Sequence, residues 1–102
     1  MTDKELLELA AKAIGLKLRY NYLGGRDANQ PWDPLEDDGD ALRLAVKLQI
    51  HMAKYDNYVS ACQLGPALGG EVVVWNHEEP DPYAATRRAI TRAAAAIGKE
   101  MP

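Results

Sequence analysis

Four carboxylates gather within five residues of this chain, at Glu36, Asp37, Asp38 and Asp40. Carboxylates at this spacing can bind a divalent cation, offer a charged surface to a partner, or cap the start of a helix. The calcium-loop pattern fails, because counting back from Gly39 puts Pro34 in the first ligand position and Ala45 where a bidentate glutamate is needed. We therefore expect Asp38 or Asp40 to cap a helix, with a direct binding role as the alternative, and we expect no metal site and no cofactor.

Trp32 stands just before these carboxylates, in a polar loop that also contains Pro31 and Pro34. A tryptophan in such a loop either packs onto the sheet edge as a plug or stays exposed as an anchor for a partner. In the second alternative, Trp32 supplies apolar area while Asp37 and Asp38 steer a basic partner. The sequence leaves both alternatives open.

Three arginines fall near the start of the alanine-rich C-terminal segment, at Arg87, Arg88 and Arg92. Arg88 and Arg92 are four residues apart, so they share one face of a helix. Guanidinium groups arranged in this way can bind a phosphate or a carboxylate. The alternative is that they form ion pairs with the acidic cluster or with the acids that precede the helix, namely Glu78, Glu79 and Asp81.

The side chains that could carry catalysis are poorly placed for it. Ser60 and Cys62 fall on one face of an expected strand, whereas activated nucleophiles favour sharp turns or helix starts. His51 and His77 can approach Cys62 across the sheet, but they lack the paired spacing of a metal site. Residues 65–71 have the glycine spacing of a phosphate loop, with glutamate in place of the lysine. We therefore expect a protein that is not an enzyme.

Composition fits one small domain spanning residues 1–102 in the cytoplasm. The chain has 102 residues, a hydrophobic content of 47% and a formal charge of -3, which argues against general nucleic-acid binding. Its single cysteine excludes an internal disulfide. The acidic, amphipathic start does not resemble a signal peptide, and no uncharged run approaches the length needed to cross a membrane.

Hydrophobic periodicity predicts an α+β fold. Apolar residues recur at three- and four-residue steps in 3–14, 40–47 and 83–99, which predicts helices there. Alternation of apolar and polar residues, or β-branched runs, predicts strands at 16–22, 48–52, 58–64 and 71–75, with glycine and proline at the breaks. The order αβαβββα indicates a mainly antiparallel four-stranded sheet covered by three helices in a layered sandwich. We expect the strands at 16–22 and 48–52 to share that sheet, with Tyr20, Ile50 and Val73 facing helices.

Two stretches resemble the phage ABA-sandwich domain family of small tailed-phage and prophage proteins. They are WDPLEDDGDALRLAVKLQI and PDPYAATRRAITRAAAAIG. The shared features are an aromatic residue followed by proline and acidic residues, a short helix, a middle strand pair and an alanine-rich final helix with arginine near its start. The resemblance covers about residues 3–100 and implies helices sandwiched around a sheet in a protein of a phage or prophage. It carries over no catalytic residues.

Together these observations favour a phage accessory protein that binds and antagonises a host component in the bacterial cytoplasm, such as a defence protein, through Trp32, Asp37 and Asp38. The alternative is a small-molecule binder that sequesters a nucleotide-type immune signal. In that case Arg88 and Arg92, with an aromatic residue such as Trp75 or Tyr83, would line a pocket, for example at a homodimer interface. A hydrolase is the least favoured alternative.

Overall fold

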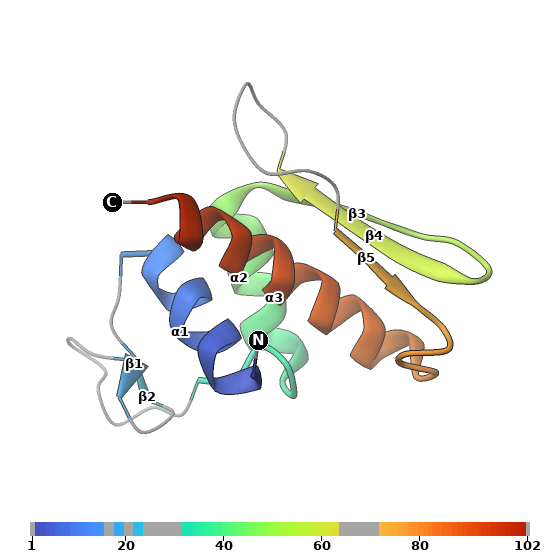
Figure 1. Cartoon of the computed structure of the whole chain (residues 1–102), viewed down its shortest axis with the longest axis horizontal. Helices are drawn as coiled ribbons and strands as arrows, with labels where there is room; N and C mark the ends of the chain where they lie inside the picture. The colour runs from blue at the N-terminus through green and yellow to red at the C-terminus, as the bar shows by residue number, and fades with distance from the viewer. Residues whose placement is uncertain (1, 16–17, 20–21, 24–31, 64–71, 102) are drawn as a thin grey trace.

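The computed structural model describes residues 2–15, 18–19, 22–23, 32–63 and 72–101 (Figure 1). In chain order its elements are α1 (Asp3–Ala13), β1 (Leu18–Arg19), β2 (Tyr22–Leu23), α2 (Asp38–Leu48), β3 (Ile50–Lys54), β4 (Tyr58–Gln63), β5 (Val72–Trp75) and α3 (Pro82–Glu100). The described part is thus an α+β fold with three helices and a three-stranded antiparallel sheet of order β3-β4-β5.

The sheet buries one face against α3. Val59 lies opposite Val74 in the register, and these two side chains are 1% and 0% exposed. Ala61 and Ile50 are also buried, and α3 contacts all three strands. Figure 1 shows the helices on this side of the sheet. The core therefore lies between the inner sheet face and the helices.

The predicted fourth strand does not join this sheet within the described residues. Leu18–Arg19 and Tyr22–Leu23 instead pair with each other as a separate antiparallel pair, with Leu18 opposite Leu23. Alternation indicates a strand but not its partner, and a partner a few residues away costs less loop-closure entropy than a distant one. Tyr20 lies outside the described residues.

The phase of the last strand also differs from our expectation. Val74 is fully buried and Val72 packs against the core, whereas Val73 lies opposite Ser60 on the other face. Successive strand residues point to opposite faces, and three consecutive valines give no sign of which phase is buried. The prediction that Val73 faces the helices is therefore wrong, while Ile50 is buried as expected.

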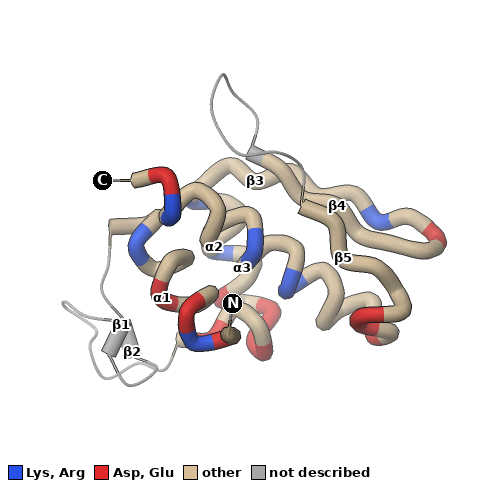
Figure 2. The backbone as a smooth tube through the Cα atoms, in the orientation of Figure 1, with Lys and Arg blue, Asp and Glu red and all other residues tan. Residues whose placement is uncertain are grey.

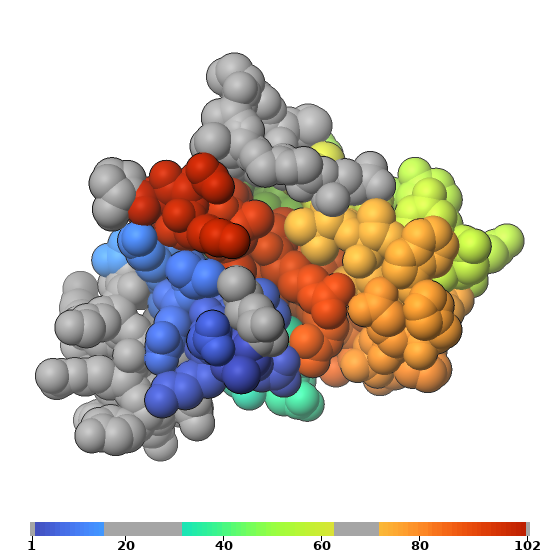
Figure 3. All heavy atoms as spheres, viewed as in Figure 1, coloured from blue at the N-terminus to red at the C-terminus, as the bar shows by residue number. Residues whose placement is uncertain are grey.

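Helices α1 and α3 approach each other closely because small residues line their contact. Ala10, Ala11 and Ala94 are fully buried. At Gly98 an added Cβ would collide with the carbonyl oxygen of Leu9 in α1. Figure 3 shows the two helices side by side at the surface, α1 in blue and the end of α3 in red. A side chain larger than hydrogen at position 98 would force the helices apart.

None of the described helices is long and apolar enough to span a membrane.

Replacing Gly98 with alanine tests this helix contact. Helix propensity alone favours alanine over an interior glycine by about 0.5–1 kcal/mol. The collision with Leu9 reverses the sign, and we expect a loss of about 1–3 kcal/mol in the free energy of unfolding, measured by urea titration.

Gly39→Ala is the matched control, because a Cβ there meets only the ends of the Arg43 and Asp37 side chains, at 3.2 Å. That variant should be as stable as the wild type or more stable. Equal effects at the two glycines would contradict the close helix contact.

Candidate functional site

The acidic cluster builds the start of α2. The Asp37 carboxylate accepts the backbone N–H of Asp40 at 2.8 Å, so Asp37 is the N-cap, rather than Asp38 or Asp40 as predicted. Asp38 instead accepts a 2.7 Å hydrogen bond from the Arg87 guanidinium, which also donates to the Leu35 carbonyl oxygen at 2.9 Å. Asp37 therefore caps α2 and Asp38 pairs with Arg87, while their side chains remain 60% and 72% exposed.

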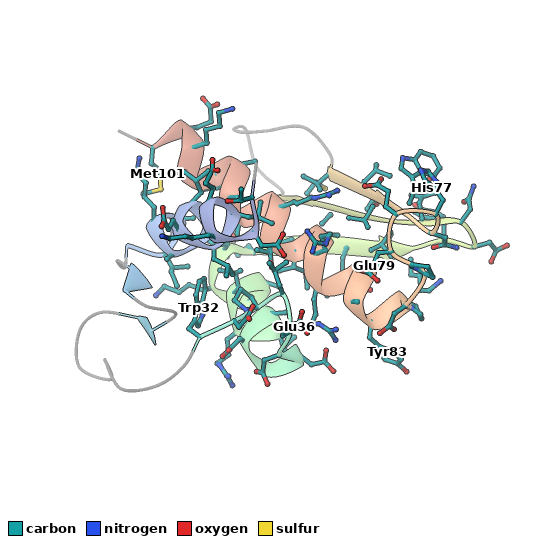
Figure 4. All side chains as sticks on the ribbon, turned by 60° about the horizontal axis from the view of Figure 1, so that its bottom comes forward. Trp32, Glu36, His77, Glu79, Tyr83 and Met101 are labelled. Atoms are coloured by element: carbon teal, nitrogen blue, oxygen red, sulfur yellow. The ribbon has the colours of Figure 1, made fainter. Side chains whose placement is uncertain are left out.

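The Trp32 side chain is buried and is not exposed as an anchor for a partner. Its side chain is only 6% exposed and belongs to the hydrophobic core; Figure 4 shows it next to α2. Asp33 fixes the loop behind it by accepting the Leu35 N–H at 3.1 Å and donating its own N–H to Asp40 at 2.9 Å. The epitope that we predicted around Trp32 is wrong in this respect, because a buried ring offers no area to a partner.

Arg88 and Arg92 do share a face, and they line one groove between α1 and α3. The groove has a volume of about 400 Å³, and Lys99 contributes a third cation. Arg88 pairs with Asp3 at 3.2 Å, and Arg92 lies 3.6 Å from Glu78. Figure 2 shows the acidic starts of α1 and α2 beside the basic part of α3. Ion pairing with Glu78 was predicted, whereas the pair with Asp3 was not.

The aromatic residues expected beside these arginines lie elsewhere. Neither Trp75 nor Tyr83 lines the groove. Tyr83 is 70% exposed at the start of α3, and Trp75 ends β5 on the outer face of the sheet, opposite Tyr58. The groove that Arg88 and Arg92 line therefore contains neither ring.

An exposed row of rings on the outer sheet face was missed by the sequence analysis. This aromatic row consists of Tyr55, Tyr58, Trp75 and His77. Neighbouring ring centroids lie 4.6, 5.1 and 6.3 Å apart along it. Tyr55 is 49% exposed and Trp75 is 41% exposed, and Figure 4 shows His77 at the far end of the sheet. The predicted hairpin already placed Tyr55 and Tyr58 near one turn. Only the pairing of β4 with β5 places Tyr58 beside Trp75.

Both candidate nucleophiles lie within β4 rather than at a sharp turn or a helix start. Ser60 is 8% exposed in the middle of β4, and half-buried Cys62 lies opposite His51 in the strand register. His77 stacks on Trp75 at the other end of the sheet. Across the described ranges, no group of three His, Cys, Asp or Glu side chains could hold a metal ion.

Asp33 gives the acidic loop a testable pH dependence. Burial raises the pKa of Asp33, the Leu35 N–H opposes this shift, and the negative charge of Glu36 adds to it. A carboxyl whose pKa is higher in the folded than in the unfolded protein stabilises the fold below its unfolded pKa. That contribution is lost as the pH rises through the folded pKa.

Asp33→Asn keeps a side-chain oxygen for the Leu35 N–H and removes this titration. We expect the variant to be at least as stable as the wild type at pH 7, with the difference in unfolding free energy shrinking as the pH falls toward 4. Urea titrations of the wild type and the variant between pH 4 and pH 7 measure this difference in unfolding free energy. A difference that widens on acidification would contradict the raised pKa.

Comparisons with protein-family models, with curated proteins and with solved structures find no match to this chain.

Proposed function

We propose that this chain is a non-enzymatic binding protein of a phage or prophage that engages and antagonises a host protein, such as a defence factor. The observation that carries the binding role is the exposed aromatic row on the outer face of the sheet. The phage origin rests on the resemblance of residues 32–50 and 80–98 to the phage ABA-sandwich family.

The aromatic row has the properties of a binding hot spot. Tyrosine and tryptophan dominate the energetics of protein interfaces, because each buries a large rigid surface with little loss of side-chain entropy. Tyr55 and Trp75 are about half-exposed, so a partner can still cover much of each ring. Strand pairing between β4 and β5 and contacts between neighbouring rings hold the row in place before binding. Such preorganisation lowers the entropic cost of association.

Two acidic residues lie at this end of the sheet, together with Lys54, whose Nζ donates to the Tyr55 carbonyl oxygen at 3.1 Å. Asp56 lies in the turn between Tyr55 and Tyr58, and Glu78 accepts the Trp75 N–H at 3.4 Å. A surface of rings with carboxylates at its rim attracts cationic side chains, since arginine and lysine stack on aromatic faces. The proposed host partner therefore presents a basic surface, as we had expected for Trp32, but to a different part of the molecule.

Trp75→Ala tests this surface. We expect affinity for the host partner to fall by about 30-fold or more, the loss typical of a tryptophan hot spot, while the fold persists because the ring is 41% exposed. The partner is first identified by capture from bacterial lysate with the wild-type protein, and its Kd is then measured by calorimetry against each variant.

Tyr83→Ala is the matched control, because it removes an aromatic ring that is 70% exposed and belongs to no ring pair among the described residues. Its affinity should equal that of the wild type. If the Trp75→Ala variant binds the partner as tightly as the wild type does, the aromatic row is not part of the interface.

A second candidate function is supported by the groove between α1 and α3. Arg88, Arg92 and Lys99 face one space of about 400 Å³, with Asp3 as the carboxylate at its edge. Three cations in a confined space suit a phosphate-bearing ligand, such as a nucleotide-type signal. Asp3 would compete with such a ligand for Arg88, since both guanidinium nitrogens face its carboxylate, at 3.2 and 3.4 Å.

Substitutions at Arg88 and at Asp3 should change nucleotide affinity in opposite directions, and this tests the second candidate function. If the groove binds a nucleotide, Arg88→Ala should weaken binding at least about tenfold, and Asp3→Asn should tighten it by freeing the guanidinium. The exposed ion pair itself contributes about 1 kcal/mol or less to stability, so both variants should fold. Calorimetry with nucleotides found by mass spectrometry in the purified protein measures both effects.

Arg43→Ala, which removes an exposed arginine on α2, is the control and should leave the nucleotide affinity unchanged. If Asp3→Asn weakens binding instead, or if no nucleotide binds, the proposal that the groove sequesters a nucleotide-type signal is wrong.

A further inference from the structure

We propose that the groove between α2 and β3 is a docking site for an acidic amphipathic helix of a partner protein. This groove has a volume of about 620 Å³ and is lined by one face of α2 and the beginning of β3. Three aliphatic side chains in its lining are strongly exposed. Leu42 is 58%, Val46 is 70% and Met52 is 43% exposed.

The connection between the two elements creates the groove. Gln49 alone separates the end of α2 from the start of β3, and it adopts the left-handed conformation, with φ of 55°. The chain therefore turns sharply, and the strand leaves the helix at once. Leu44 faces the core, whereas Leu42 and Val46, four residues apart, form a second apolar stripe beside the buried one. No described segment covers that stripe.

The charge around the groove specifies its occupant. Residues 41–55 contain Arg43, Lys47, Lys54 and His51 but no aspartate or glutamate, although the whole chain has 15 acidic and 12 basic residues. Lys47 is exposed on α2 next to Val46, whereas the Arg43 guanidinium is already paired, at 2.8 Å from Asp40 and 3.9 Å from Asp37. A partner that matches this surface places apolar side chains in the groove and carboxylates on its flanks.

An amphipathic helix meets both requirements better than other occupants. Its side chains at i, i+3, i+4 and i+7 form a ridge that fits a groove, and a flanking glutamate can reach Lys47. A second copy of this chain, docked by a two-fold axis, would bring the basic rim against itself. A membrane surface suits a broad, protruding apolar face, whereas this lining forms a shallow, open recess between a helix and a strand.

Synthetic amphipathic helices test the proposal. One panel carries leucine along one face and glutamate on its flanks, and a matched panel carries lysine in place of glutamate. Binding of fluorescently labelled peptides is followed by anisotropy. We expect the acidic panel to contain peptides that bind at least about tenfold more tightly than their lysine counterparts, with affinity falling as salt is raised.

Variants of the groove locate the site. Leu42→Ser with Val46→Ser should abolish binding of the acidic peptides, and Lys47→Glu should weaken it while strengthening binding of the lysine peptides. All three positions are exposed, so the fold should survive, as circular dichroism checks. The single variant Val46→Gln repeats the test if the double variant does not fold. Tyr83→Ser is the control and should bind like the wild type.

Three results would overturn the proposal. In the first, no acidic peptide binds, or the groove variants bind as the wild type does. In the second, anionic phosphatidylserine vesicles bind in place of the peptides and lose binding in the groove variants, which assigns the surface to membranes. In the third, ultracentrifugation shows a dimer that these variants dissociate, which assigns it to a second copy. Trp75→Ala, which tests the aromatic row, should leave peptide binding unchanged, so the two surfaces fail or succeed independently.

Discussion

The close contact between Gly98 of α3 and the backbone of Leu9 in α1 is the constraint on which the rest of the structure depends. Helix α3 contacts α1, α2 and each strand of the three-stranded sheet. A helix with so many neighbours needs a thin cross-section, and alanine and glycine provide it at most of its buried positions. The alanine bias of this segment therefore reflects packing on several sides as well as helix propensity. Its polar buried residue, Thr91, is satisfied within the helix by donating to the Arg87 carbonyl oxygen at 2.8 Å.

The arginines at the start of α3 extend this central role to the polar parts of the molecule. Arg87 joins the loop before α2 to α3 through Leu35 and Asp38, and Arg88 joins the start of α1 to α3 through Asp3. Arg87 is the more buried of the two, with 15% of its side chain exposed against 25% for Arg88. Removing the partners of the more buried guanidinium costs more than removing those of the more exposed one. Arg88 is therefore better placed than Arg87 to exchange its carboxylate for an anion, as our second candidate function proposes.

Local patterns in the sequence predicted the helices and the three main strands, because periodicity, caps and turn residues act over a few neighbours. The bounds of α1 and α3, which lie within one residue of the predicted ones, and the burial of Ile50 follow from such short-range signals. Register and phase did not follow, because they depend on which distant strand pairs and which face α3 covers. The valines at 72–74 illustrate this, since any of them could have faced the core. The aromatic row was missed for the same reason: Tyr58 and Trp75 are 17 residues apart in the chain and meet only through the pairing of β4 with β5.

Trp32 shows how burial decides between two functional interpretations of one residue. A tryptophan beside a cluster of carboxylates looks like a binding epitope, but here the ring fills the core while Asp33, Asp37 and Asp40 use their oxygens to build the loop and the helix start. Carboxylates that accept backbone N–H groups have less capacity left for a partner, and a buried ring has none. Among the described residues, the large exposed apolar side chains lie instead on β3, at strand ends, on the second stripe of α2 and at the two ends of α3. Those surfaces differ in charge, with Asp56 and Glu78 at the aromatic row and Lys47 at the α2–β3 groove, so our two proposals assign them partners of opposite charge.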